Sequence, residues 1–165
     1  KSMLSKIIYV AKNKYFYLLL AIVLIVPIVY EKLPVRIDIT QQSSLPQKVW
    51  ITYSNLDIET EYMLFKPSKN KYIKDGTLYL KKIACKEGDY LVVKDREFFC
   101  NGVYLGTASE FDGNKNKVDM FIFNGEIPKN KFFVVGTHTL SHDSKYFGFV
   151  DISQVVRKAK PFFVE

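Results

Sequence analysis

The segment TLYLKKIAC (77–85) indicates the fold class, because it is a short run of β-branched, aromatic and other apolar residues that ends just before Glu87-Gly88-Asp89. Runs of this length between turn residues are typical of β-strands. Six further segments share its character: VWITY (49–53), YLVVKD (90–95), EFFC (97–100), MFIF (120–123), KFFVVG (131–136) and FGFVDI (147–152). No segment after residue 31 has a long helical period, so the sequence predicts an all-β or mostly β domain.

Two adjacent lysines lie in the middle of the first segment. Because side chains alternate along a strand, Lys81 and Lys82 point to opposite faces. The face of Lys81 also carries three other residues: Tyr79, Ile83 and Cys85. Alternation alone does not decide which of the two lysines is buried.

An uncharged apolar run precedes the β segments. Residues 15–30, YFYLLLAIVLIVPIVY, lie between Lys14 and Glu31. As a helix they cover about 24 Å of a hydrocarbon core of about 30 Å, and the terminal tyrosines and flanking lysines can extend this span. The run therefore predicts a transmembrane anchor.

A cleavable signal peptide and a buried core helix are the alternatives to an anchor. Residues 31–36, EKLPVR, contain no small-x-small cleavage site, which favours a retained anchor. The basic residues before the run place that end in the cytoplasm. We therefore expect a cytoplasmic basic tail (1–14), an anchor in the bacterial inner membrane (15–30) and an extracytoplasmic or periplasmic catalytic domain (31–165).

The net charge of +7 is unevenly distributed. Four lysines precede the apolar run without any acidic residue, which leaves +3 for the rest of the chain. No nucleic-acid-binding motif accompanies this charge, so nucleic acid is not an expected partner.

Three separated stretches carry the polar residues of a candidate site. Ser44-Leu45-Pro46 follows the apolar run, Lys81 stands seven residues before the glycine of Gly88-Asp89, and SHDSKYFG spans 141–148. In this order they resemble the type I signal peptidases, most closely the shorter TraF-type branch of conjugative transfer. The third stretch is similar at nearly every position to that family's S-x-D-S-R-Y-[WF]-G signature.

The resemblance implies that Ser44 is the nucleophile and Lys81 the general base. A serine hydroxyl is a weak nucleophile until a base takes its proton, and a lysine can do so only when it is neutral. Burial among apolar side chains disfavours the ammonium form and lowers the lysine pKa. We therefore expect Lys81 to be buried, with Nζ about 3 Å from Ser44 Oγ.

The resemblance also implies supporting residues. Ser141 is similar to the family serine that orients the lysine, and Asp143 and Lys145 are similar to an Asp-Arg pair that supports the site. Lys145 replaces the usual arginine and so lacks a bidentate fork. Gly136-Thr137 stands where housekeeping members have Gly-Asp.

An acyl-transfer site also needs donors for the developing oxyanion. The backbone N–H of Ser44 is the first candidate. Gln42 occupies the position at which the family often has a hydroxyl residue, and its side-chain amide is the second candidate. Thr40 and Ser43 remain alternatives to Gln42.

The histidines and cysteines suggest other chemistry. His138 and His142 are four residues apart, but a turn-rich context and Thr139 in place of a glutamate are wrong for a zinc protease, so no metal or other cofactor is expected. Cys85 and Cys100 lie on consecutive predicted strands, where either a disulfide or two buried thiols would fit.

Together these features predict a membrane-anchored serine endopeptidase that cleaves signal peptides or pilin precursors at the outer face of the membrane. The resemblance implies a preference for small residues one and three positions before the scissile bond. Hydrolysis and cyclisation are alternative outcomes. The expected partners are membrane-bound precursor proteins and the lipid bilayer. The competing hypothesis is a non-catalytic anchored β domain of a secretion or conjugation apparatus.

Overall fold

The contacts within the chain group it into two units, with the boundary between Arg36 and Ile37. The first part contains helix α2, Lys14–Lys32, which has the length and composition needed to cross a membrane and buries none of its side chains. The predicted anchor, 15–30, lies inside this helix. The computed structural model describes four ranges: residues 14–40, 44–68, 73 and 76–163.

Short strands are the main regular elements of the chain after α2, which confirms the predicted mostly β fold. In chain order the elements after α2 are β1 Val35–Ile39, β2 Val49–Tyr53, β3 Tyr62–Phe65, β4 Tyr79–Lys86, β5 Tyr90–Lys94, β6 Glu97–Cys100, β7 Val103–Thr107, β8 Gly125–Glu126, β9 Lys131–Val135, α3 Ser144–Phe147, β10 Val150–Asp151, the 3-10 turn Ile152–Gln154 and β11 Val155–Pro161.

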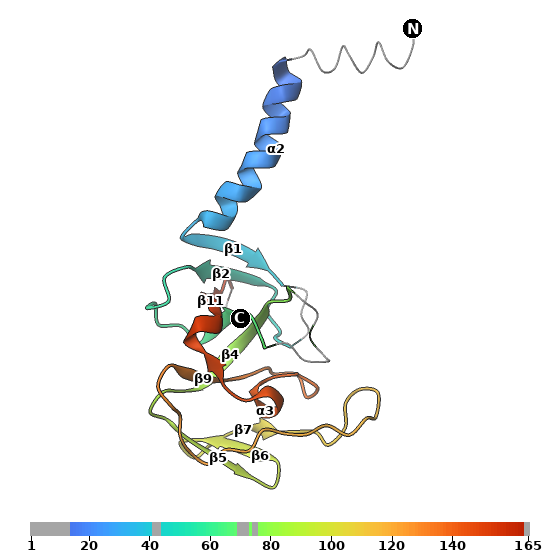
Figure 1. Cartoon of the computed structure of the whole chain (residues 1–165), viewed down its shortest axis with the longest axis vertical. Helices are drawn as coiled ribbons and strands as arrows, with labels where there is room; N and C mark the ends of the chain where they lie inside the picture. Colours follow the sequence, from blue (N-terminus) through green and yellow to red (C-terminus); the bar gives the residue numbers. More distant parts are fainter. Residues whose placement is uncertain (1–13, 41–43, 69–72, 74–75, 164–165) are drawn as a thin grey trace. The chain divides into compact units, whose positions relative to one another are not determined.

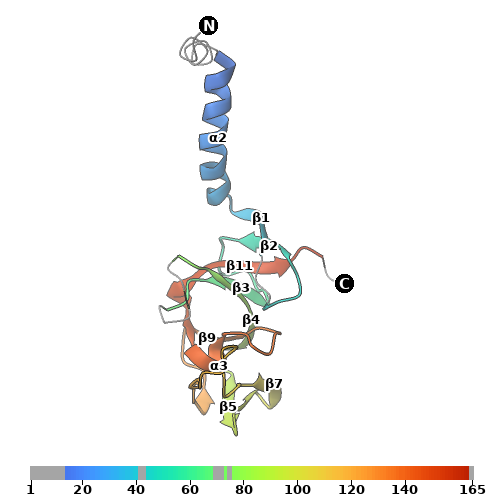
Figure 2. The same ribbon diagram turned by 90° about the vertical axis from the view of Figure 1, so that its right-hand side faces the viewer.

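The strands form two sheets. The larger has the order β1-β2-β11-β3-β4-β9-β10, and the smaller has the order β7-β6-β5-β8. Figures 1 and 2 show β9 and α3 between the β2–β11 end of the larger sheet and the smaller sheet. Strand β4 lies inside the larger sheet, where it pairs antiparallel with β3 on one side and with β9 on the other. A central strand of this kind gives a catalytic side chain a rigid support.

Three apolar clusters hold the fold together. The first joins the two sheets, because Cys85 and Phe133 of the larger sheet pack with Phe98 of the smaller one. The second lies around Met63, Phe65, Val134, Val150 and Val155, and the third consists of Leu45, Trp50, Leu80 and Ala159. Each fully buried side chain of this size contributes roughly 1.5–3 kcal/mol to stability.

Two predicted strands differ from the structure. Residues 120–123 form no strand; Phe121 and Phe123 instead pack as partly buried rings against the first cluster. In the segment 147–152 only Val150–Asp151 is a strand, because Asp143 caps a short helix that extends to Phe147. Five strands were not predicted from the sequence: β1, β3, β7, β8 and β11.

Candidate active site

The third apolar cluster brings the first two predicted site residues together. Leu45 and Leu80 are both buried in it, although they are far apart in the sequence. Their neighbours Ser44 and Lys81 are buried as well, with exposed fractions of 9% and 3%. The serine loop therefore packs on the β4 strand at the position of the lysine.

The structure distinguishes the two adjacent lysines. Lys81 is opposite Met63 of β3, and its Nζ donates a 2.7 Å hydrogen bond to Ser141 Oγ. The side chain of Lys82 is 45% exposed and its Nζ lies 3.5 Å from Glu61 Oε2. A β-bulge between Ile83 and Cys85 then interrupts the alternation along β4.

The surroundings of Lys81 lower its pKa to about 8. Burial is the largest cause, because it disfavours the ammonium form. Asp143 acts in the opposite direction and Lys145 in the same direction as burial. Near neutral pH a larger fraction of Lys81 is therefore neutral than for an exposed lysine, which is the form that a general base requires.

Ser44 is held by its backbone and not by its hydroxyl. Its Oγ is buried and makes no hydrogen bond to the residues that the structure describes, so the expected hydrogen bond with Lys81 Nζ is not formed. Lys81 Nζ donates to Ser141 instead. The Ser44 carbonyl oxygen accepts from Thr137 N at 2.9 Å and from Thr137 Oγ1 at 3.2 Å.

The segment that contains Ser141 is fixed by Asp143. This carboxylate is fully buried and caps α3, where Oδ1 accepts from Lys145 N at 3.1 Å. Oδ2 accepts from Lys145 Nζ at 2.8 Å and from Gly136 N at 3.0 Å. Ser144 Oγ accepts a further hydrogen bond from Val134 N at 2.9 Å. The Ser141–Lys145 segment is thus attached to the end of β9.

Gly136 is necessary for the close approach of these parts. A Cβ atom at this position would collide with Ser141 Oγ and would lie 3.0 Å from the Ser44 carbonyl oxygen. Sequence reasoning identified Gly136-Thr137 only as a departure from the family pattern and did not predict its contacts. Of the other predicted oxyanion residues, Gln42 and Ser43 lie outside the described residues, and Thr40 N donates to the Lys48 carbonyl oxygen at 2.9 Å.

The two histidines make different contacts. His138 Nδ1 accepts from Leu140 N at 3.1 Å, and the His142 ring stacks on Tyr146 with centroids 5.8 Å apart. Potential metal ligands do converge elsewhere, at Cys85, Asp89 and Cys100.

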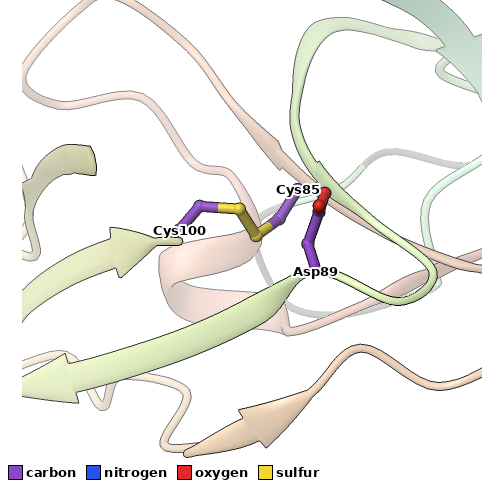
Figure 3. A group of neighbouring side chains, drawn as sticks. All are labelled: Cys85, Asp89 and Cys100. Carbon is purple, nitrogen blue, oxygen red and sulfur yellow. A yellow bond between two sulfur atoms is a disulfide. The ribbon is translucent and has the colours of Figure 1, made fainter. Parts of the chain in front are cut away.

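Figure 3 shows this group of side chains. The sulfur atoms of Cys85 and Cys100 are bonded to each other, and their Cα atoms are 5.9 Å apart. Asp89 accepts from Lys86 N and from Asn101 Nδ2, both at 2.8 Å. A disulfide and a hydrogen-bonded turn therefore account for the cluster, and the disulfide links β4 to β6.

We expect a thiol titration of the unfolded, unreduced chain to find no free thiol. Reduction should lower the free energy of unfolding by about 3 kcal/mol in the entropic model, because the bridge closes a loop with a sequence separation of 15. Denaturant unfolding with and without reductant measures this change. A double Cys85→Ala, Cys100→Ala variant is the control and should not respond to reductant, and a count of two thiols in the unreduced chain would exclude the bridge.

Comparisons with known proteins identify the family. The sequence model described as signal peptidase, peptidase S26, matches residues 9–164. The chain is therefore a serine peptidase. Within that class it belongs to the signal peptidase family, peptidase S26.

Among solved structures, a signal peptidase I from Enterococcus faecalis is similar, with 24% sequence identity and a TM-score of 0.37. The match covers 57% of this chain and 88% of that chain. No curated protein matches the chain. Family membership implies secreted preproteins as the class of substrate.

Proposed function

We propose that this chain is a membrane-anchored endopeptidase with a Ser44–Lys81 dyad. The observation that carries the proposal is the buried Lys81 side chain, whose Nζ is 2.7 Å from Ser141 Oγ and whose pKa is lowered to about 8. A buried lysine of this kind, packed beside a serine loop, is suited to general-base catalysis.

The proposed reaction is acyl transfer. Lys81 Nζ takes the proton of Ser44 Oγ as that oxygen attacks the scissile carbonyl, and the proton then passes to the leaving amine. Water or another amine resolves the ester, which frees Ser44. Ser44 Oγ has no hydrogen-bond partner among the described residues, so a hydrogen bond to Lys81 Nζ would break none that the serine hydroxyl now makes, which supports this role.

Ser141 and Asp143 are proposed to support the base. Ser141 Oγ accepts from Lys81 Nζ, which orients the nitrogen toward the serine loop. Asp143 holds Gly136 and Lys145 and so keeps the Ser141 segment at the end of β9. The backbone N–H of Ser44 and the side chain of Gln42 are the proposed oxyanion donors.

The pKa of Lys81 predicts the pH dependence of cleavage. Because the neutral amine is the active form, kcat/KM should rise with pH and level off above about 8. Below that pH the rate should fall about tenfold for each pH unit. A pH profile of kcat/KM measures this limb, and a limb near the ordinary lysine pKa would contradict the buried-base assignment.

Helix α2 supports the proposed topology. It is uncharged from Tyr15 to Tyr30 and has lysines at both ends, Lys14 and Lys32. We propose that residues 1–14 are cytoplasmic, that 15–30 anchor the chain in the inner membrane, and that 31–165 form the periplasmic catalytic domain. Ser44 follows the anchor closely in sequence, so the site would lie near the membrane surface where precursors emerge.

Secreted preproteins and pilin precursors are the proposed substrates. The match to a peptidase family favours this function over a non-catalytic β domain. The test is incubation of the full chain in detergent micelles with candidate precursors, followed by mass spectrometry of the products. The product masses give the cleavage site and distinguish a linear from a cyclic product. If no precursor is cleaved, the proposal fails.

A further inference from the structure

We propose that Thr137 is a positioning residue that orients Ser44 through its side-chain hydroxyl. The inference rests on the proposed function, because Ser44 is the nucleophile of that reaction. The Ser44 carbonyl oxygen accepts two hydrogen bonds, both from Thr137: one from its backbone N–H at 2.9 Å and one from Oγ1 at 3.2 Å.

The orientation of Ser44 depends on its backbone. Ser44 Oγ has no hydrogen-bond partner among the described residues, so no polar contact of the side chain fixes its direction. The Ser44 carbonyl and the Leu45 nitrogen belong to the same rigid peptide unit. Thr137 holds one end of this unit, and burial of the Leu45 side chain holds the other. These two contacts place the Cα of Ser44 and so the point from which its Oγ projects.

Thr137 also connects the serine loop to the strand that carries Lys81. It follows β9 almost directly, and β9 is paired with β4 from Val135 opposite Lys82. Between them, Gly136 is held by its N–H donating to Asp143 Oδ2. Thr137 and the pairing of β9 with β4 therefore hold Ser44 in position relative to Lys81.

Of the two hydrogen bonds to the Ser44 carbonyl oxygen, the one from the hydroxyl depends on which amino acid occupies position 137. Any residue other than proline supplies the backbone donor, but only some side chains can donate to a carbonyl oxygen. The aspartate that housekeeping members have here cannot do so when it is ionised. In this chain the threonine side chain therefore supplies a donor to the Ser44 carbonyl oxygen that an ionised aspartate could not supply.

The test compares Thr137→Val, which keeps the shape and removes the hydroxyl, with Thr137→Ser, which keeps the hydroxyl. The substrate is a synthetic quenched-fluorescence peptide with alanine one and three positions before the scissile bond. We expect Thr137→Val to lower kcat about 5-fold at unchanged KM, the effect of one neutral hydrogen bond, and Thr137→Ser to stay within about 2-fold of the original chain. The pH limb should not move, because the contacts of Lys81 remain.

Thr107→Val is the matched control, because Thr107 Oγ1 also makes a side-chain hydrogen bond, to Tyr104 OH at 2.6 Å, but on the smaller sheet. It should leave kcat unchanged. Equal kcat values for the original chain and Thr137→Val would overturn the inference. So would a Thr137→Ser variant as slow as Thr137→Val.

A second measurement does not depend on cleavage. Hydrogen exchange of peptides covering residues 44–50 should be faster in Thr137→Val than in Thr137→Ser, because the Ser44 carbonyl oxygen has lost the hydrogen bond from the side-chain hydroxyl. If the original chain cleaves no precursor or peptide, the proposed function fails and exchange alone decides the inference. Equal exchange in the two variants then overturns it, and faster exchange in Thr137→Val supports it.

Discussion

Lys81→Met is expected to lower kcat/KM for precursor cleavage by on the order of 10⁴-fold or more while the fold stays intact. Methionine keeps an unbranched apolar stem in the buried site and removes the amine, so no base takes the proton of Ser44. Ser44→Ala should have an effect of similar size, because it removes the proposed nucleophile. Steady-state kinetics with a cleaved precursor, together with circular dichroism of each variant, measures both quantities.

Lys82→Met is the matched control for this prediction. Lys82 is the next residue on the same strand, but its side chain is exposed and pairs with Glu61. Its removal should change kcat/KM by no more than about 2-fold. The double variant Ser44→Ala, Lys81→Met should be no worse than either single variant, because the two residues act as a unit. Cleavage retained in Lys81→Met or in Ser44→Ala would contradict the dyad.

The strands that the sequence predicted are those whose own residues favour the β conformation. VWITY and EFFC have the same limits in the structure as in the prediction. By contrast, β11 reads VVRKAKP, and three of its charged residues, Arg157, Lys158 and Lys160, obscure any apolar pattern. It forms because it lies between β2 and β3 and pairs with both. Such a strand is determined by its neighbours and not by its own composition.

The sequence could predict those candidate site residues for which the proposed chemistry requires a particular residue type. A serine before a proline, a lysine in an apolar strand and the segment 141–148 could be identified from the sequence. Alternation alone could not decide which of Lys81 and Lys82 is buried, because it gives two equivalent faces. The family resemblance selected Lys81, and in the structure its hydrogen bond to Ser141 and its pairing with β3 distinguish it from Lys82. The contacts of Gly136 and Thr137 were also hidden, since they depend on how closely three distant segments approach.

Lys145→Met is expected to lower the free energy of unfolding by about 3–5 kcal/mol. Lys145 Nζ lies 2.8 Å from Asp143 Oδ2, and the two side chains are 5% and 0% exposed. Removing the amine leaves a carboxylate buried with only its backbone N–H donors, from Gly136 and from residue 145. Denaturant unfolding measures the loss. The same change should move the acid limb of cleavage to higher pH, because Lys145 lowers the pKa of Lys81.

Lys131→Met is the control for the Lys145→Met prediction, because it removes an ion pair that is more exposed to solvent. Lys131 Nζ lies 2.7 Å from Asp151 Oδ2, but these side chains are 37% and 32% exposed, so solvent screens the interaction. Its removal should cost about 1 kcal/mol or less and leave the acid limb in place. Equal costs for Lys145→Met and Lys131→Met would mean that burial does not strengthen the Asp143–Lys145 pair. If the acid limb of the pH profile does not move in Lys145→Met, the charge of Lys145 does not affect the pKa of Lys81. Ser141 would then be the residue that supports Lys81.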